Sequence, residues 1–403
     1  VSGSALLGGG SSVTTATLGG TEAEVRSSAA DQVVLVAARP VDSDADPEAI
    51  VLVSDTGAIV ELSGSFAYVD EGVVTSLEPD VGQLGTTVTI EGTALFGAGE
   101  SVVRVTLAGV EAEIDTANAS DTQVVVVAAS SDAGNGDVVL TSNTEATVTS
   151  EGTWTYAAVG VVTAVSPANG QHDTRVEIVG ERLQGAGSAV VGVTLAGTEV
   201  KTLVSQSDTV VNVVADDAAA GSGAIILTAD TGAIVTGVDW EYLEAGVITD
   251  VSPSSGQVGT VVEIAGERML GGGDDIDSVS LVGTEVTITN SSDTSIHVVA
   301  EDVSAGTGNI VITSTTGAIT TQENGFTYLE RGAISAVSPA EGQTGTLVTI
   351  TGEGLRGGGA RFDTIRLGGV LVRELVSGAT RSDGGDEQVV VRAASSASAG
   401  SGV

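Results

Sequence analysis

Short apolar runs separated by polar, glycine-rich segments recur along the whole chain. The runs are rich in valine, isoleucine and threonine, whereas Gly, Ser, Asn and Asp fill the segments between them. No stretch has a helical period. Between residues 73 and 156 the runs are Val73–Val74, Val88–Ile90, Val102–Leu107, Val124–Val127, Val138–Leu140 and Thr147–Tyr156. Strands of this length with frequent turn signals predict an all-β fold made of antiparallel sandwiches.

One period relates this stretch to the rest of the chain. The tyrosines lie 88, 86 and 86 residues apart, at Tyr68, Tyr156, Tyr242 and Tyr328. The same period recurs in Pro79, Pro167, Pro253 and Pro339, and in Gly-Gln pairs beginning at Gly82, Gly170, Gly256 and Gly342. These markers predict a tandem array with units of about 86 residues. We expect complete repeats at 71–157, 158–243 and 244–329, and partial repeats at 1–70 and 330–403.

An aromatic pair closes each repeat. The first ring precedes the repeat tyrosine by two residues, so that both side chains point to the same face of a strand. Since aromatic residues make up only 2 % of the chain, we expect these pairs to anchor the repeat cores. An exposed platform that stacks against carbohydrate is the competing hypothesis. The pairs are Phe66 with Tyr68, Trp154 with Tyr156, Trp240 with Tyr242, and Phe326 with Tyr328.

The residues of one repeat carry a family resemblance. Residues Val247–Gly266 resemble the opening of an IPT/TIG domain, with its Pro-x-x-Gly and Gly-Thr-x-Val elements. Leu281–Val286 resembles the middle strand and turn of that family, Ser292–Ile296 its polar turn, and Phe326–Tyr328 its closing strand. The resemblance extends over the whole chain, although Asp173 replaces the glycine of one copy.

The resemblance implies an immunoglobulin-like sandwich of the early-set type. Domains of this family serve mostly as extracellular spacers or adhesive modules, and in one branch they bind DNA in transcription factors. A fold with such varied uses does not define a function by itself.

The charge balance narrows the range of partners. The chain has 53 acidic and 14 basic residues, with Lys201 as its only lysine, and a net charge of −39. Binding to nucleic acid or to an anionic membrane surface requires clustered Lys and Arg, so both are disfavoured. A solvated, secreted surface fits the acidic balance. The absence of cysteine is compatible with either a cytosolic or a secreted protein.

No catalytic pattern stands out. The two histidines, His172 and His297, occupy non-equivalent repeat positions, and no nucleophile pair or metal-spaced cluster accompanies them. The Gly-Gly-Gly runs that begin at Gly8, Gly271 and Gly357 precede strands, so we expect loops with positive φ angles rather than phosphate cradles. The sequence therefore predicts neither an enzyme nor a bound cofactor.

Two groups of aspartates are candidate calcium ligands. Asp42, Asp44 and Asp46 alternate in one loop, but Pro47 and Val53 occupy the sixth and twelfth places of an EF-hand count. Asp274, Asp275 and Asp277 fail the same count and lie in a different part of their repeat. We therefore expect solvated loops and no calcium site that recurs in every repeat.

Two N-glycosylation sequons occupy equivalent turns. Asn118-Ala119-Ser120 and Asn290-Ser291-Ser292 each lead into an Asp-Thr pair. Their shared position predicts Asn118 and Asn290 as attachment sites on one repeated surface, although chance sequons are common in a Ser/Thr-rich chain.

Short junctions connect the repeats. Segments such as Ala157–Gly160 and Leu243–Gly246 are too brief to act as flexible tethers, which predicts consecutive domains that abut. Both end segments align with only part of a repeat. Two hypotheses account for this: a slice of a longer array, or strands supplied by neighbouring subunits. No stretch of 18 apolar residues is present, so no membrane insertion is expected within this segment.

These observations predict a non-enzymatic, extracellular structural protein, the shaft of a surface filament, hair-like appendage or adhesin stalk. Its expected partners are copies of itself or neighbouring repeats of a longer chain, with possible glycans. A ligand-binding adhesin or receptor ectodomain that recognises carbohydrate or protein is the alternative. An accessory module of a polysaccharide-degrading enzyme is a third, weaker hypothesis.

Overall fold

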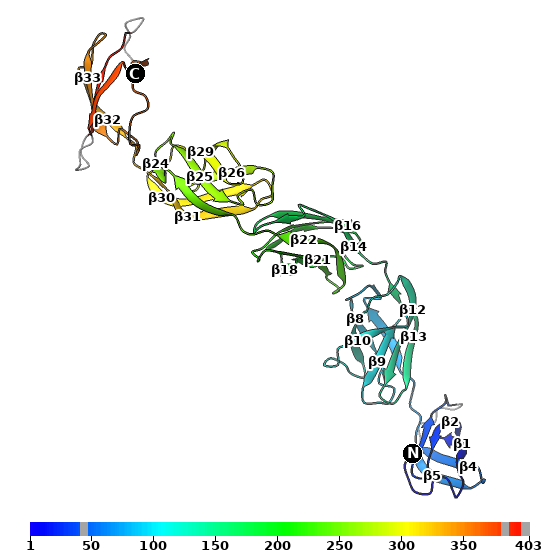
Figure 1. Cartoon of the computed structure of the whole chain (residues 1–403). Coiled ribbons are helices and arrows are strands. Elements are labelled where there is room, and N and C mark those ends of the chain that lie inside the picture. The colour runs from blue at the N-terminus through cyan, green and yellow to red at the C-terminus, as the bar shows by residue number, and fades with distance from the viewer. Residues whose placement is uncertain (41–46, 380–386, 396–403) are drawn as a thin grey trace. The chain divides into compact units, whose positions relative to one another are not determined.

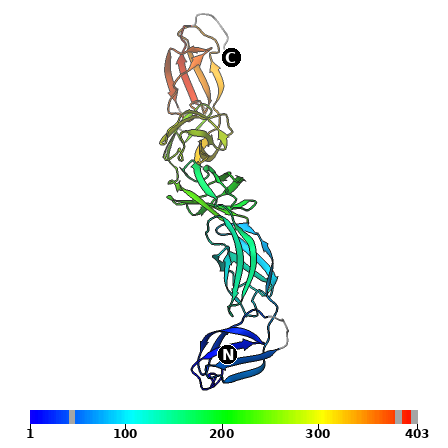
Figure 2. The ribbon, with the colours of Figure 1, turned by 90° about the vertical axis from the view of Figure 1, so that its right-hand side faces the viewer.

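The computed structural model describes residues 1–40, 47–379 and 387–395. Within these residues the secondary structure consists of β-strands and turns without any helix, as Figures 1 and 2 show from two directions. The chain divides into two compact units. The first contains Val1–Val159 with Thr231–Ala233, and the second contains Gly160–Asp230 with Ile234–Val403. The predicted all-β fold is confirmed.

The first unit contains one five-stranded and one eight-stranded sheet. The five-stranded sheet has the order β3-β2-β1-β4-β5, with β1 (Val13–Leu18), β2 (Thr21–Ser28), β3 (Val33–Val36), β4 (Glu48–Ser54) and β5 (Ile59–Phe66). The eight-stranded sheet has the order β6-β8-β11-β10-β9-β12-β13-β7, with β6 (Val73–Glu78), β7 (Val81–Gly82), β8 (Thr87–Thr93), β9 (Val102–Leu107), β10 (Val110–Ile114), β11 (Gln123–Val127), β12 (Gly134–Ser142) and β13 (Thr147–Tyr156).

The second unit begins with a nine-stranded sheet and continues with two smaller pairs of sheets. The nine strands are β14 (Val161–Ser166), β15 (Asn169–Gly170), β16 (Arg175–Glu181), β17 (Val190–Leu195), β18 (Thr198–Glu199), β19 (Thr202–Gln206), β20 (Val210–Val214), β21 (Gly221–Ala229) and β22 (Ile234–Tyr242). The next repeat is a sandwich of two sheets, ordered β23-β25-β29-β28 and β24-β31-β30-β26-β27.

The strands of that sandwich are β23 (Val247–Ser252), β24 (Ser255–Gly256), β25 (Val261–Glu267), β26 (Ile276–Leu281), β27 (Thr284–Glu285), β28 (Thr287–Asn290), β29 (Ser295–Val299), β30 (Gly306–Ser314) and β31 (Ile319–Tyr328). The last segment forms the sheets β32-β33-β37-β36 and β34-β35. Its strands are β32 (Ala333–Ser338), β33 (Leu347–Glu353), β34 (Arg366–Leu367), β35 (Val370–Leu371), β36 (Glu374–Ala379) and β37 (Glu387–Arg392).

Alternation of apolar and polar residues explains why these segments form strands. In β25 the side chains of Val262 and Ile264 are buried, whereas the intervening Glu263 is exposed. The partner strand β29 places Ile296 opposite Ile264 and Val298 opposite Val262, so that two β-branched pairs meet on the inner face. A register slip of one residue would turn both pairs outward, and the buried face therefore specifies the pairing.

Each complete repeat has its own hydrophobic core. The core of the 244–329 repeat combines residues of both sheets, including Ile264, Val279, Ile296 and Ile312, around Phe326 and Tyr328. Equivalent clusters surround Trp154 and Trp240 in the two preceding repeats. Because each cluster belongs to a single repeat, each repeat can bury its apolar surface largely by itself.

The glycine runs adopt the loop geometry that the sequence predicts. Gly271 and Gly272 have φ angles of 56° and 83°, and Gly357 and Gly358 have 59° and 89°. Asp173 also has a positive φ, 67°, at the position where the other repeats have glycine. The departure at Asp173 therefore leaves the local backbone conformation unchanged.

Candidate functional site

The aromatic pairs lie inside the repeats that they close. The six rings of the complete repeats are buried, and within each pair the rings meet edge to face, with 4.5 Å between the ring centroids of Trp240 and Tyr242. Phe66 and Tyr68 of the first segment make the same contact but are only half-buried. Buried rings cannot offer a stacking surface to a sugar. The buried residues are Trp154, Tyr156, Trp240, Tyr242, Phe326 and Tyr328.

Burial also affects the tyrosine hydroxyl groups. Desolvation raises the pKa of Tyr156, Tyr242 and Tyr328 above the ordinary value of 10.0. Near Tyr242 the carboxylates of Asp216 and Asp217 raise the pKa further, since they repel a phenolate. These phenols stay protonated at neutral pH and act as part of the core.

The two sequon asparagines are exposed at equivalent sequence positions, although Asn118 lies in the loop after β10 and Asn290 is still part of a strand. Asn118 donates a hydrogen bond from Nδ2 to Oδ2 of Asp115 at 2.7 Å, and its sequon hydroxyl, Ser120, bonds within the same turn. Asn290 ends β28 and pairs with His297 of β29, while the hydroxyl of Ser292 donates to the carbonyl of Ser295 at 2.9 Å. Attachment of a glycan at either asparagine stays a prediction.

Among the residues that the structure describes, the acidic groups form no recognisable metal centre. The cluster of Asp42, Asp44 and Asp46 lies outside the described residues. Asp275 accepts hydrogen bonds from the hydroxyl of Ser291 and the amide of Ile276, which lower the pKa of its carboxyl group. No group of three His, Cys, Asp or Glu side chains in the described ranges is arranged to hold a metal ion.

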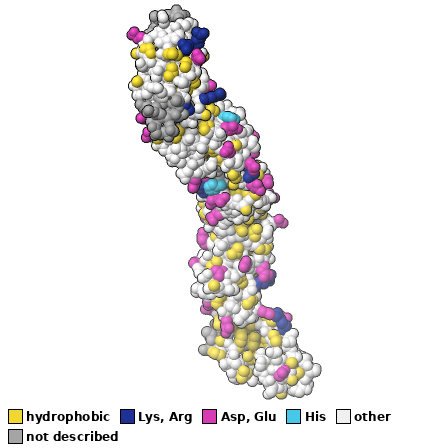
Figure 3. Space-filling model, turned by 60° about the vertical axis from the view of Figure 1, so that its left-hand side comes forward, with side chains coloured by type: hydrophobic (Ala, Val, Ile, Leu, Met, Phe, Trp, Pro, Cys, Tyr) yellow, Lys and Arg dark blue, Asp and Glu magenta, His cyan; other side chains and the backbone are white. Residues whose placement is uncertain are grey.

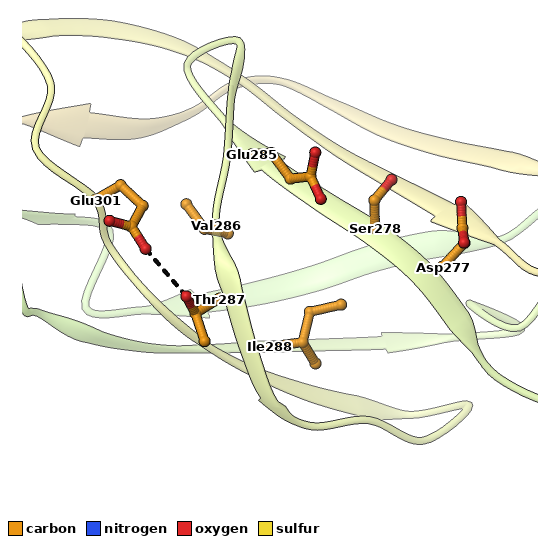
Figure 4. Close-up of a pocket in the computed structure, with 7 residues that line it drawn as sticks. All are labelled: Asp277, Ser278, Glu285, Val286, Thr287, Ile288 and Glu301. Atoms are coloured by element: carbon orange, nitrogen blue, oxygen red, sulfur yellow. Dashed lines mark hydrogen bonds between the residues drawn. The ribbon is translucent and has the colours of Figure 1, made fainter.

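A shallow hollow beside these residues is lined by acidic and hydroxyl groups (Figure 4). Thr287 donates to Oε1 of Glu301 at 3.0 Å, and Glu285, Ser278 and Asp277 line the same hollow. Val286 and Ile288 complete its lining, and no aromatic ring contributes. Acidic side chains are also spread widely over the face shown in Figure 3, with few basic groups among them.

One polar cluster occurs in a single repeat. Nζ of Lys201 lies 2.6 Å from Oδ1 of Asp173, and Nε2 of His172 lies 3.1 Å from Oδ2 of the same carboxylate. Asp216 approaches the other ring nitrogen of His172 at 3.9 Å. No pattern in the sequence links His172, Asp173 and Lys201. All three are unusual residues within one repeat: one of two histidines, the only lysine, and an aspartate in place of glycine.

The repeats of the second unit are joined by direct backbone contacts. The amide of Arg175, in the 158–243 repeat, donates to the carbonyl of Thr316 in the 244–329 repeat at 2.8 Å. The amide of Ile319 donates back to the carbonyl of His172 at 3.4 Å. A side-chain Cβ at Gly246 would lie 2.3 Å from Oγ1 of Thr320, so the connecting segment passes too close to the next repeat for any residue but glycine.

No helix among the described residues is long and apolar enough to cross a membrane. The IPT/TIG domain model matches the chain three times, at residues 73–156, 161–242 and 247–328. No curated protein sequence gives a significant match. The domain boundaries at 71, 158, 244 and 330 stay those predicted from the sequence.

Several solved structures are similar to the chain at low identity. The full extracellular region of plexin A4 is 14 % identical with a TM-score of 0.37, and the match covers 94 % of this chain and 39 % of that one. The SGBP-B of the Bacteroides ovatus mixed-linkage glucan utilization locus, in complex with a mixed-linkage heptasaccharide, is 16 % identical with a TM-score of 0.21, covering 66 % and 68 %. The I9-I11 tandem from titin is 10 % identical with a TM-score of 0.22, covering 64 % and 97 %.

Proposed function

The chain belongs to the IPT/TIG domain family, and from that premise we propose that it is a non-enzymatic, extracellular structural protein, the shaft of a surface filament, hair-like appendage or adhesin stalk. Its repeats act mechanically, by holding a distal element away from a surface or by building a fibre. Copies of the chain, or further repeats joined to it, are the proposed partners along the shaft.

The direct contact between repeats of the second unit is the observation that carries this proposal. Backbone hydrogen bonds join Arg175 to Thr316 and Ile319 to His172 across a junction of a few residues. The close passage of Gly246 beside Thr320 leaves no slack in the connecting segment. Domains joined in this way resist bending more than domains on a flexible linker, which is the property that a shaft requires.

Surface charge supports the same role. A net charge of −39 gives neighbouring shafts a mutual repulsion that keeps them hydrated and separate. Salt screens this repulsion over a Debye length of about 8 Å at physiological ionic strength. Lateral packing of shafts is therefore expected to increase as salt is added.

Electron microscopy and light scattering of native material test the proposal. We expect extended, beaded particles or fibres whose mass exceeds that of one chain, 39.6 kDa. A salt series checks the charge argument, since bundling should appear only at high ionic strength. Isolated particles of single-chain mass under every condition would contradict the filament and favour the receptor alternative.

The cluster around Asp173 favours a ligand-binding adhesin or receptor ectodomain as a second candidate. A uniform shaft has equivalent loops in every repeat, whereas His172 and Asp173 stand where the next repeat has Val258 and Gly259. Glycan and protein arrays probed with the full chain test this candidate. Binding that is lost in Lys201→Ala and retained in Arg104→Ala, whose ion pair with Glu111 lies elsewhere, would support it.

A further inference from the structure

The Gly-Gln pair marks each repeat, and in the 158–243 repeat its glutamine reaches the next repeat. Gln171 follows β15 and is only 3 % exposed. Its Nε2 donates to the carbonyl of Glu244 at 2.7 Å and to the carbonyl of Arg268 at 3.2 Å. Glu244 belongs to the connecting segment and Arg268 to the 244–329 repeat. One side-chain amide therefore bonds to both the connector and the following domain.

The bond to the connecting segment recurs at the next junction. Nε2 of Gln257 donates to the carbonyl of Glu330 at 2.5 Å, and its Oε1 accepts a hydrogen bond from the amide of Gly332 at 3.1 Å. Glu244 and Glu330 are equivalent, because each is the second residue after its repeat tyrosine. Two equivalent side chains that find the same backbone partner argue against an accidental contact.

The loop that carries the glutamine is held in place by its own repeat. The amide of Gln171 donates to Oγ1 of Thr174 at 2.9 Å, and the amide of Gln257 donates to Oγ1 of Thr260 at 3.0 Å. The preceding Gly170 packs so closely that a Cβ there would lie 2.4 Å from Oγ1 of Thr174. The Gly-Gln-x-x-Thr pattern is thus the sequence signature of a rigid loop that presents the amide.

Burial makes this amide sensitive to the arrangement of the repeats. A carboxamide removed from water must keep its hydrogen bonds, because an unpaired buried donor is costly. If the 244–329 repeat swung away, Gln171 would lose the carbonyl of Arg268. The orientation in which both bonds form is therefore favoured over others.

We propose that the glutamine of the Gly-Gln pair is an inter-repeat latch, whose carboxamide fixes the orientation of the following IPT/TIG repeat by binding the backbone of the connector and of that repeat. This latch would make the junction between the repeats stiff, which is the property that the proposed shaft needs. Its biological use therefore rests on the proposed shaft function. The amide of Gln171 binds the backbone carbonyl of Arg268 and not its side chain. The latch therefore does not depend on which residue type occupies that position in the next repeat.

Distance measurement between spin labels tests the latch on the full chain. The protein has no cysteine, so labels can be attached at Val191→Cys in the 158–243 repeat and Val261→Cys in the 244–329 repeat, both exposed positions. We expect a narrow distance distribution that broadens about twofold or more in Gln171→Ala, because both amide bonds are lost. Gln171→Glu, which keeps the size but cannot donate, should broaden it similarly.

Gln184→Ala is the matched control. Its Nε2 donates to the carbonyl of Ser188 and to Gln206, both within its own repeat, so the distribution should stay narrow. Circular dichroism identifies any variant that does not fold. If Gln171→Ala fails that check, Gln257→Ala with labels at Val261→Cys and Leu371→Cys provides the same test at the next junction, where the glutamine is less buried.

An unchanged distribution in folded Gln171→Ala and Gln171→Glu would overturn the latch. That result is separable from failure of the shaft proposal. Fibres in microscopy together with unchanged distances would mean that the shaft holds without the latch. Single particles with broadened distances would mean that the latch operates in a protein that is no shaft.

Discussion

Lys201 pairs with Asp173 at 2.6 Å in a loop where Gly85, Gly259 and Gly345 stand in the other repeats. Asp173 has a φ of 67°, in a region that costs energy for residues with a side chain. The ion pair holds the carboxylate, which is 16 % exposed, and offsets part of that cost. The only lysine of the chain is thus associated with the only replacement of this glycine.

Two substitutions at Asp173 separate the energetic cost of its positive φ from the contribution of its ion pair with Lys201. Asp173→Gly removes both the strain and the ion pair, so we expect a change in unfolding free energy within about 1 kcal/mol. Asp173→Ala keeps the strain and loses the pair, and should destabilise the 158–243 repeat by about 1–2 kcal/mol. Urea denaturation followed by the fluorescence of Trp240 measures both. Equal effects of the two substitutions would show that the positive φ of this position costs nothing for a residue with a side chain.

Truncation of a repeat tyrosine should unfold its own repeat preferentially. Tyr242→Ala removes a buried ring and is expected to destabilise by about 3–5 kcal/mol. Tyr242→Phe keeps the buried ring and removes only the hydroxyl, so its effect should stay below about 1 kcal/mol.

The two tryptophans make this prediction measurable repeat by repeat. Trp240→Phe leaves Trp154 as the only tryptophan and reports on the 71–157 repeat, whereas Trp154→Phe reports on the 158–243 repeat. We expect only the second reporter to respond strongly to Tyr242→Ala, since arrays couple mainly through neighbours. A change of about 0.5 kcal/mol or less would indicate an exposed ring and return the carbohydrate platform to consideration.

Stability should fall in alkali because of the buried tyrosines. The pKa of Tyr156, Tyr242 and Tyr328 is raised in the folded protein above the value of 10.0 expected when the chain is unfolded. Their contribution is therefore complete below about pH 10 and is lost as the pH rises through the folded pKa values. The unfolding free energy should decline as the pH rises above about 10.

The Phe variant isolates the tyrosine contribution. Tyr242→Phe removes one titrating phenol, so the alkaline decline of the 158–243 repeat should be shallower than in the wild-type protein. Identical pH profiles for Tyr242→Phe and the wild-type protein would be inconsistent with this explanation.

The fold could be predicted from local sequence patterns because the same patterns recur in every repeat. The two-residue spacing of Phe326 and Tyr328 indicated a shared strand face, and the β-branched runs specified the strands around it. The contact of Gln171 with Glu244 could not be predicted in this way. The partner of the Gln171 amide is a backbone carbonyl, which every residue type has, so the sequence does not mark it. The two groups are also far apart in the sequence and meet only in the folded protein.

The pairing of Lys201 with Asp173 illustrates a different limit. Asp173 was visible as a departure from the repeat pattern, and Lys201 as a rarity, but a pairing that occurs once has no period. The turn before β16 and the turn before β19 meet through the sheet order β16-β20-β19, which the sequence does not specify. A side-chain pairing that occurs in only one repeat can therefore be recognised in the structure but not in the repeat pattern.

Asn118 and Asn290 should carry N-linked glycan if the protein passes through a glycosylating secretory pathway. Both residues are exposed, Asn118 in the loop between β10 and β11 and Asn290 at the end of β28, where a transferase can reach them. Peptide mass analysis of material from the native source should find glycan at both, and its loss in Ser120→Ala and Ser292→Ala. Asn143 is equally exposed but lies outside a sequon, so it should stay bare and serves as the internal control. Unmodified Asn118 and Asn290 in secreted native protein would contradict the prediction and leave the acidic side chains as the main source of surface hydration.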